Sequence, residues 1–89
     1  MTAVEHTLQQ RHERYGTYLQ TAQLIQDLKD VMHRAPQWVD LEADQKESLD
    51  LIANKIGRIL RGDANYVDSW HDIAGYATLI EKRLNGEEL

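Results

Sequence analysis

The sequence has no cysteine, a single proline and no long apolar run. Without cysteine the chain forms no disulfide, and nothing in it indicates an oxidising compartment. No apolar segment reaches the roughly 20 residues that a membrane-spanning helix needs, and residues 1–6 lack the basic and apolar regions of a secretory signal. We therefore expect a soluble, cytoplasmic protein that does not engage a membrane.

A strongly basic surface is also missing, because the net charge is −5 at pH 7. The local groups of cations are small and lie at Arg11 to Arg14 and at Lys55 to Arg61. A protein that binds a nucleic-acid duplex normally carries a larger basic patch that neutralises phosphates. Long nucleic acid is therefore not an expected partner, whereas a small phosphorylated molecule needs only two or three cationic groups.

The near absence of proline and the abundance of helix formers predict one all-α domain of 89 residues. Apolar residues at helical spacing predict about four helices, over residues 2–14, 18–33, 44–60 and 66–84. Residues 1–16 then hold the N-terminal helix, 17–84 the core helices and 85–89 a tail. Thr17, followed by Gln20, is an expected N-cap with a capping box, and Asn65 is the expected N-cap of the last helix.

The same spacing predicts which side chains these helices bury. On the third helix they are Leu49, Ile52, Ile56, Ile59 and Leu60, and on the last helix they are Trp70, Ile73, Ala77, Ile80 and Leu84. Trp38 and Val39, in the linker after Pro36, and Val4 and Leu8, in the first helix, exceed what one small bundle can cover. We therefore expect a dimer or a larger homo-oligomer.

The most informative run is Asp68 to Tyr76, which places two carboxylates one helical turn apart. Asp68 and Asp72 lie within about 40° of each other on a helical wheel, at the border of the apolar side. A hairpin through the short turn at residues 62–65 lets Lys55 and Arg58 of the preceding helix face them. Opposite charges at such a border either pair with each other or bind a phosphate and a cation in the groove between the helices.

Simpler roles stay open for these residues. Asp68 in the first helical turn can stabilise the helix start, and Asp72 can form an ion pair with Lys55 or Arg58. Gly75 in mid-helix costs roughly 1 kcal/mol relative to alanine, which indicates close approach of another helix or of a ligand. Tyr76 and Trp70 are expected to be core or interface aromatics whose polar atoms find partners.

Other polar patterns carry less chemistry. The pairs Asp27/Asp30 and Glu47/Asp50 have metal-like spacing, but they lie opposite the apolar sides of their helices and are expected to be solvated. The four histidines show no zinc-type spacing, and the chain has no glycine-rich phosphate loop and no nucleophile elbow.

Three motifs together resemble those of a known family: Tyr15-Gly16, Lys55-Ile56-Gly57-Arg58 and Asp68-x-x-x-Asp72-Ile73-x-Gly75-Tyr76-Ala77. From Arg11 to Leu84 the chain resembles small phage and prophage helical proteins of unassigned function. That family is similar to the MazG-type all-α nucleoside triphosphate pyrophosphohydrolases.

The resemblance implies a MazG-like oligomer in which acidic residues of an E-x-x-E helix and an E-x-x-D helix bind magnesium. By position, Asp72 and Asp68 would then be the metal ligands of the second motif. The chain contains no E-x-x-E sequence, and hydrolysis between phosphates needs a fuller metal site than two carboxylates provide.

Three functions remain as hypotheses. The first is a nucleotide-binding phage-type protein that sequesters a nucleotide or a nucleotide-derived signal from a host sensor in the host cytoplasm, at a site shared between subunits. Its expected ligand-binding residues are Lys55, Arg58, Tyr15, Trp70 and Tyr76. The second is a magnesium-dependent nucleotide pyrophosphohydrolase, and the third is a protein-binding adaptor or inhibitor without a small-molecule site.

Overall fold

A computed structural model describes residues 2–88 of the chain, without the side chains of residues 14 and 15. Four α-helices account for most of it: α1 (Ala3–Tyr15), α2 (Tyr18–His33), α3 (Ala43–Arg61) and α4 (Val67–Leu84). A short 3-10 helix, η1 (Trp38–Asp40), lies in the connection between α2 and α3. No strand occurs in residues 2–88, so the predicted all-α class with four main helices is confirmed.

Local signals explain where the helices begin and end. Thr2 caps α1 in a reciprocal capping box with Glu5, and the Thr17 hydroxyl caps α2 by accepting the Gln20 N–H, as predicted. The expected capping box at α2 is not formed, because the Gln20 side-chain oxygen accepts from the Thr17 hydroxyl and from Arg61 instead. Between these helices Gly16 has φ 77°, a left-handed conformation that favours glycine. The chain can therefore turn from α1 into α2 without strain.

The start of α4 differs from the prediction. Tyr66, rather than Asn65, is the N-cap, and its side chain makes no capping hydrogen bond. The Asn65 N–H instead donates to the Asp63 carboxylate at 2.9 Å, which stabilises the turn before the helix. Asp68 is consequently the second residue of α4 and not the third.

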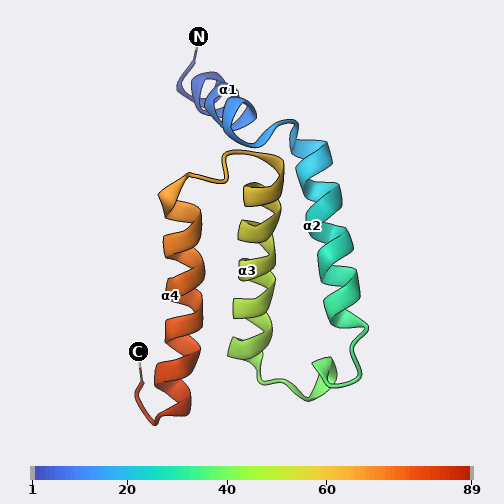
Figure 1. Cartoon of the computed structure of the whole chain (residues 1–89), viewed down its shortest axis with the longest axis vertical. Coiled ribbons are helices and arrows are strands. Elements are labelled where there is room, and N and C mark those ends of the chain that lie inside the picture. The colour runs from blue at the N-terminus through green and yellow to red at the C-terminus, as the bar shows by residue number, and fades with distance from the viewer. Residues whose placement is uncertain (1, 89) are drawn as a thin grey trace.

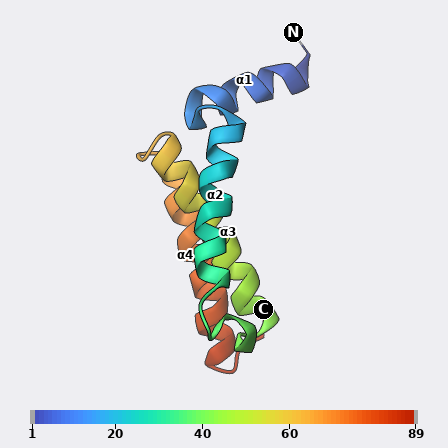
Figure 2. The same cartoon turned by 90° about the vertical axis from the view of Figure 1, so that its right-hand side faces the viewer.

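Helices α2, α3 and α4 form a single layer with α3 in the middle (Figure 1). The view turned by 90° shows these three helices overlapping, whereas α1 projects from the end where α2 begins (Figure 2). The Cα radius of gyration is 15.2 Å. A globular chain of this length has a radius of about 12 Å, so the chain with its projecting α1 is more extended than a spherical domain.

Small residues let α2 approach α3. Gly57 is buried, and a Cβ atom there would overlap the side chain of Ile25 on α2. His33 at the end of α2 bonds Asp50 of α3 at 2.8 Å, and Arg61 at the end of α3 donates to the side-chain carbonyl of Gln20. Polar contacts thus join α2 to α3 at both ends of the pair.

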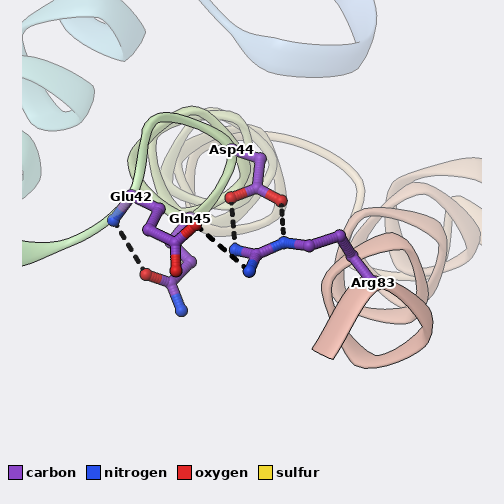
Figure 3. Close-up of polar contacts among 4 residues, drawn as sticks. All are labelled: Glu42, Asp44, Gln45 and Arg83. Atoms are coloured by element: carbon purple, nitrogen blue, oxygen red, sulfur yellow. Dashed lines mark hydrogen bonds and ion pairs between the residues drawn. The ribbon is translucent and has the colours of Figure 1, made fainter. Parts of the chain in front are cut away.

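Helix α4 packs on the other side of α3. Ser69 of α4 is 2% exposed. At the far end Arg83 of α4 donates two hydrogen bonds of 2.7 Å to the Asp44 carboxylate and lies 3.2 Å from Glu42 (Figure 3). This clamp joins the last turn of α4 to the first turn of α3.

The predicted burial of the apolar side chains is largely wrong. The exposed fractions are 40% for Leu49, 37% for Ile56 and 65% for Leu60 on α3, and 55% for Trp70 and 60% for Leu84 on α4. Ala77 is exposed as well, whereas Ile52, Ile59, Ile73 and Ile80 are half-buried. The cause is the single-layer arrangement, because α2 and α4 cover α3 from two sides and leave its apolar stripe open.

Candidate functional site

The α3–α4 hairpin brings Lys55 and Asp72, two of the predicted charged residues, into contact. Lys55 Nζ on α3 lies 2.7 Å from Asp72 Oδ2 on α4, as expected if the short turn makes the two helices antiparallel neighbours. The Lys55 side chain is 15% exposed and that of Asp72 is 37% exposed. Below, the polar edge means Lys55, Arg58, Asp68 and Asp72.

Electrostatics at the polar edge favour the charged form of Asp72. The pKa of Asp72 lies below its ordinary value, first because Lys55 donates a hydrogen bond to the carboxylate. Desolvation partly offsets this effect, and the charges of Lys55, His71 and Arg58 lower the pKa further. Arg58 itself is half-buried. The ion pair of Lys55 with Asp72 matches the simpler role considered for Asp72.

Asp68 makes a different contact. Its carboxylate accepts a hydrogen bond of 3.0 Å from the Tyr66 hydroxyl, and its backbone lies in the first turn of α4. A carboxylate there interacts favourably with the positive end of the helix dipole. Asp68 thus contributes to the start of α4 and remains exposed at the surface.

The predicted aromatic residues do not all reach the polar edge. Trp70 precedes Asp72 by two residues, which places the two side chains about 160° apart on the helix. The Trp70 indole N–H donates to the Ala64 carbonyl at 2.8 Å and so secures the turn before α4. Tyr76 is half-buried one helical turn beyond Asp72. The Tyr15 side chain lies outside the described part of the chain.

Gly75 leaves an uncovered stretch of backbone beside the polar edge. It is exposed, and within the described residues a Cβ atom added there meets nothing within 4 Å apart from its chain neighbours and the backbone of α4. Packing within the subunit therefore does not account for a glycine in the middle of α4. Gly75 lies on the Asp68/Asp72 side of the helix wheel, where it permits close approach from outside the subunit.

The other acidic pairs are placed largely as expected. Asp27, Asp30 and Glu47 are exposed, but Asp50 is half-buried because it pairs with His33. Within residues 2–88, no group of three or more His, Asp or Glu side chains lies close enough together to hold a metal ion. Two carboxylates of the polar edge are the nearest approach to the metal site that the resemblance implies.

An apolar groove lies elsewhere on the layer and was not predicted as a site. Its volume is about 360 Å³, and it runs between the end of α2, η1 and the apolar stripe of α3. It is lined mainly by Met32, Ala35, Trp38, Leu41, Leu49, Ile52 and Ile56. Trp38 also stacks on His33, with ring centroids 4.3 Å apart. The expected excess of apolar surface around Trp38 was the one sequence signal for this groove.

Comparison with protein-family models, with curated proteins and with solved structures found no match to this chain. In the described residues, no helix combines the length and the apolar character needed to cross a bilayer.

Proposed function

We propose that the polar edge binds a small phosphorylated ligand of nucleotide type and retains it without hydrolysis, at a site completed by a second subunit. One observation carries the proposal: Lys55 pairs with Asp72, the charge of Arg58 acts on the same carboxylate, and the Cβ position of Gly75, one helical turn away, faces open space. Helix backbone exposed at a glycine beside charged groups is suited to close approach by a ligand or a neighbouring chain.

The chemistry of the ion pair defines how such a ligand would bind. The Lys55 ammonium has three donors, and the contact with Asp72 uses one of them. A phosphate group would compete with Asp72 for Lys55 and would gain from Arg58 as a second cation. With magnesium present, Asp72 could instead contact the ion while Lys55 contacts the phosphate.

The test is titration calorimetry with a panel of nucleoside phosphates and cyclic nucleotides, without and with magnesium. Lys55→Ala and Arg58→Ala are expected to weaken binding at least about tenfold each, because each removes a charge-assisted contact. Lys29→Ala on α2 is the matched control and should leave affinity unchanged. Absence of binding across the panel, or equal effects of Lys55→Ala and Lys29→Ala, would overturn the proposal.

Asp72→Asn separates retention from hydrolysis. If the ligand is held without metal, removal of the competing carboxylate should strengthen binding, and the ligand should be recovered intact after heat denaturation. If the protein is a magnesium-dependent pyrophosphohydrolase, the same change should abolish release of pyrophosphate. Asp27→Asn, an exposed carboxylate on α2, serves as the control in both assays.

Hydrolysis is the less supported alternative. Asp72 is engaged by Lys55 and Asp68 by Tyr66, and the described residues hold no third carboxylate beside them. A phosphoryl-transfer site normally needs further ligands to fix its metal ions.

A second candidate function, that of a protein-binding adaptor or inhibitor, is favoured by the apolar groove. Apolar surface of this kind often marks a protein interaction site. A stable complex with a different protein in a pull-down, lost when Ile56 is replaced by glutamate, would support it.

A further inference from the structure

We propose that Asn85 is a site of spontaneous chemical modification, where loss of the side-chain amide places a carboxylate at the C-terminal end of α4. Asn85 is the C-cap of α4, and Gly86 follows it. Both residues are exposed to solvent. The proposal concerns the end of α4 and does not depend on ligand binding at the polar edge.

The reaction joins two atoms of adjacent residues. The backbone nitrogen of Gly86 attacks the side-chain carbonyl carbon of Asn85, and the new carbon–nitrogen bond closes a five-membered succinimide ring. The side-chain nitrogen leaves as ammonia and takes up the proton lost by the Gly86 nitrogen. Water then opens the ring at one of its two carbonyl carbons, which yields aspartate or isoaspartate. Water is the only co-reactant, so the reaction needs no enzyme.

The residue after each asparagine determines how closely the backbone nitrogen can approach the side chain. The chain has asparagine at positions 54, 65 and 85. Asn54 is half-buried within α3, where a lysine follows it, and Asn65 precedes the bulky Tyr66. Gly86 has no side chain to obstruct the attack, and within the described residues a Cβ atom added to it would meet nothing within 4 Å apart from its chain neighbours. Asn85 is therefore the asparagine whose reaction is least hindered.

Backbone hydrogen bonds within α4 hold the turn that contains Asn85. The Gly86 N–H donates to the Arg83 carbonyl at 3.0 Å and the Glu87 N–H donates to the Lys82 carbonyl at 2.9 Å. Together with φ 88° at Gly86, these bonds form a Schellman motif. The attack requires that the Gly86 N–H leave its acceptor and that the backbone of Asn85 rotate. This opening breaks hydrogen bonds of the last turn alone, and helix ends open at a low free-energy cost.

The new carboxylate would lie where a negative charge is unfavourable. The C-terminal end of a helix carries the negative end of its dipole. Glu81 precedes position 85 by one helical turn, and Glu87 and Glu88 follow it. Isoaspartate would in addition insert a side-chain carbon into the backbone, so that the Schellman motif could not close. Because Arg83 takes part in this motif and also clamps Asp44, we expect the modification to loosen this end of the α3–α4 pair.

The first test is peptide mapping by mass spectrometry of the full chain after prolonged incubation in warm, mildly alkaline buffer. Conversion of the amide to a carboxylate is expected at Asn85, as a mixture of aspartate and isoaspartate. Asn54 and Asn65 are the internal controls and should stay largely unchanged. The rate at Asn85 should lie within about tenfold of the rate in the chain unfolded by guanidinium, because the end of a helix opens readily. Absence of conversion at Asn85, a rate far below that of the unfolded chain, or equal conversion at Asn65 would each overturn the proposal.

The second test uses variants that separate the reaction from its consequence. Asn85→Gln keeps an amide at the helix end, but its longer side chain would have to close a larger ring, so conversion should nearly cease. Asn85→Asp reproduces the aspartate product and should lower the thermal unfolding midpoint by a few degrees, whereas Asn85→Gln should leave it unchanged. Asn65→Asp is the matched control, since it adds the same charge at an exposed position before the positive end of α4 and should not lower the midpoint.

Each result of the second test decides one part of the proposal. Conversion in the Asn85→Gln variant at the wild-type rate would overturn the ring-closing reaction. An Asn85→Asp variant as stable as the wild-type protein would overturn the loosening of α4.

Discussion

Arg83 holds the carboxylate of Asp44 through two parallel hydrogen bonds of 2.7 Å, across 39 residues of sequence (Figure 3). The contact raises the pKa of Arg83 and lowers that of Asp44, in both cases chiefly through the hydrogen bonds between them. Planar, two-point contact of this kind is specific to arginine, because lysine presents a single ammonium. The clamp therefore fixes the register of α3 and α4 at the end opposite their connecting turn.

Substitution of Arg83 should lower the thermal stability in a graded manner. Arg83→Ala removes the clamp and is expected to lower the unfolding midpoint by a few degrees, whereas Arg83→Lys should retain part of the ion pair and lie in between. Lys82→Ala, in the same helical turn, controls for loss of a cation at the helix C-terminus. Thermal unfolding followed by circular dichroism is the measurement, and equal midpoints for the Arg83→Ala and Lys82→Ala variants would contradict the role of the clamp.

Stability should fall in acid because of Asp44 and Asp72. Both carboxyl groups have pKa values below the ordinary 3.8 in the folded chain, so the unfolded chain binds protons more readily. Their contribution is fully present above the ordinary pKa and is lost as the pH falls through the lowered values.

The measurement is the unfolding midpoint from about pH 5 to about pH 2, with all variants at the same ionic strength. Asp72→Asn and Arg83→Ala should each flatten the acid dependence, and Asp27→Asn should not. An acid profile that is the same in all four proteins would show that these pairs do not contribute.

Local sequence signals account for what could be predicted of the fold. The helix starts at Thr2 and Thr17 follow from caps, and the apolar spacing along α3 identifies the correct stripe. Spacing does not say what covers a stripe, and so burial of Leu49, Ile56 and Leu60 was predicted wrongly. Whether the apolar stripe of α3 is covered depends on how many helices pack around α3, and local sequence does not encode that number.

The contacts of the candidate site could also be predicted only in part. The short turn before α4 makes α3 and α4 neighbours, and the contact of Lys55 with Asp72 follows from helix geometry alone. The clamp of Arg83 on Asp44 and the contact of His33 with Asp50 join residues whose registers depend on the tertiary packing. The sequence alone could have shown that Trp70 does not share a side of α4 with Asp72, because residues i and i+2 of a helix point in nearly opposite directions.

Trp70→Phe should separate a structural from a ligand-binding role for this side chain. The change removes the hydrogen bond from the indole to the Ala64 carbonyl and is expected to cost about 1 kcal/mol of unfolding free energy. Affinity for any ligand of the polar edge should not change, because Trp70 points away from Asp72. Denaturant unfolding and calorimetry on the same preparation provide both values, and a loss of affinity with unchanged stability would reverse the assignment.

Gly57 and Gly75 offer a matched pair of substitutions with opposite expected signs. Gly57→Ala should destabilise the fold, because its methyl group would overlap Ile25 and force α2 away from α3. Gly75→Ala meets open space within the subunit and should stabilise the helix by about 0.5–1 kcal/mol.

Both values come from denaturant unfolding of the variants beside the wild-type protein. If Gly75 serves close approach at the polar edge, the Gly75→Ala variant should also bind a phosphorylated ligand more weakly while being more stable. Higher stability together with weaker binding is not expected if Gly75 has only a structural role. In that case the more stable α4 would position Asp72 at least as well as in the wild-type protein. A variant that gains stability and keeps full affinity would remove Gly75 from the site and leave Lys55 and Arg58 as its determinants.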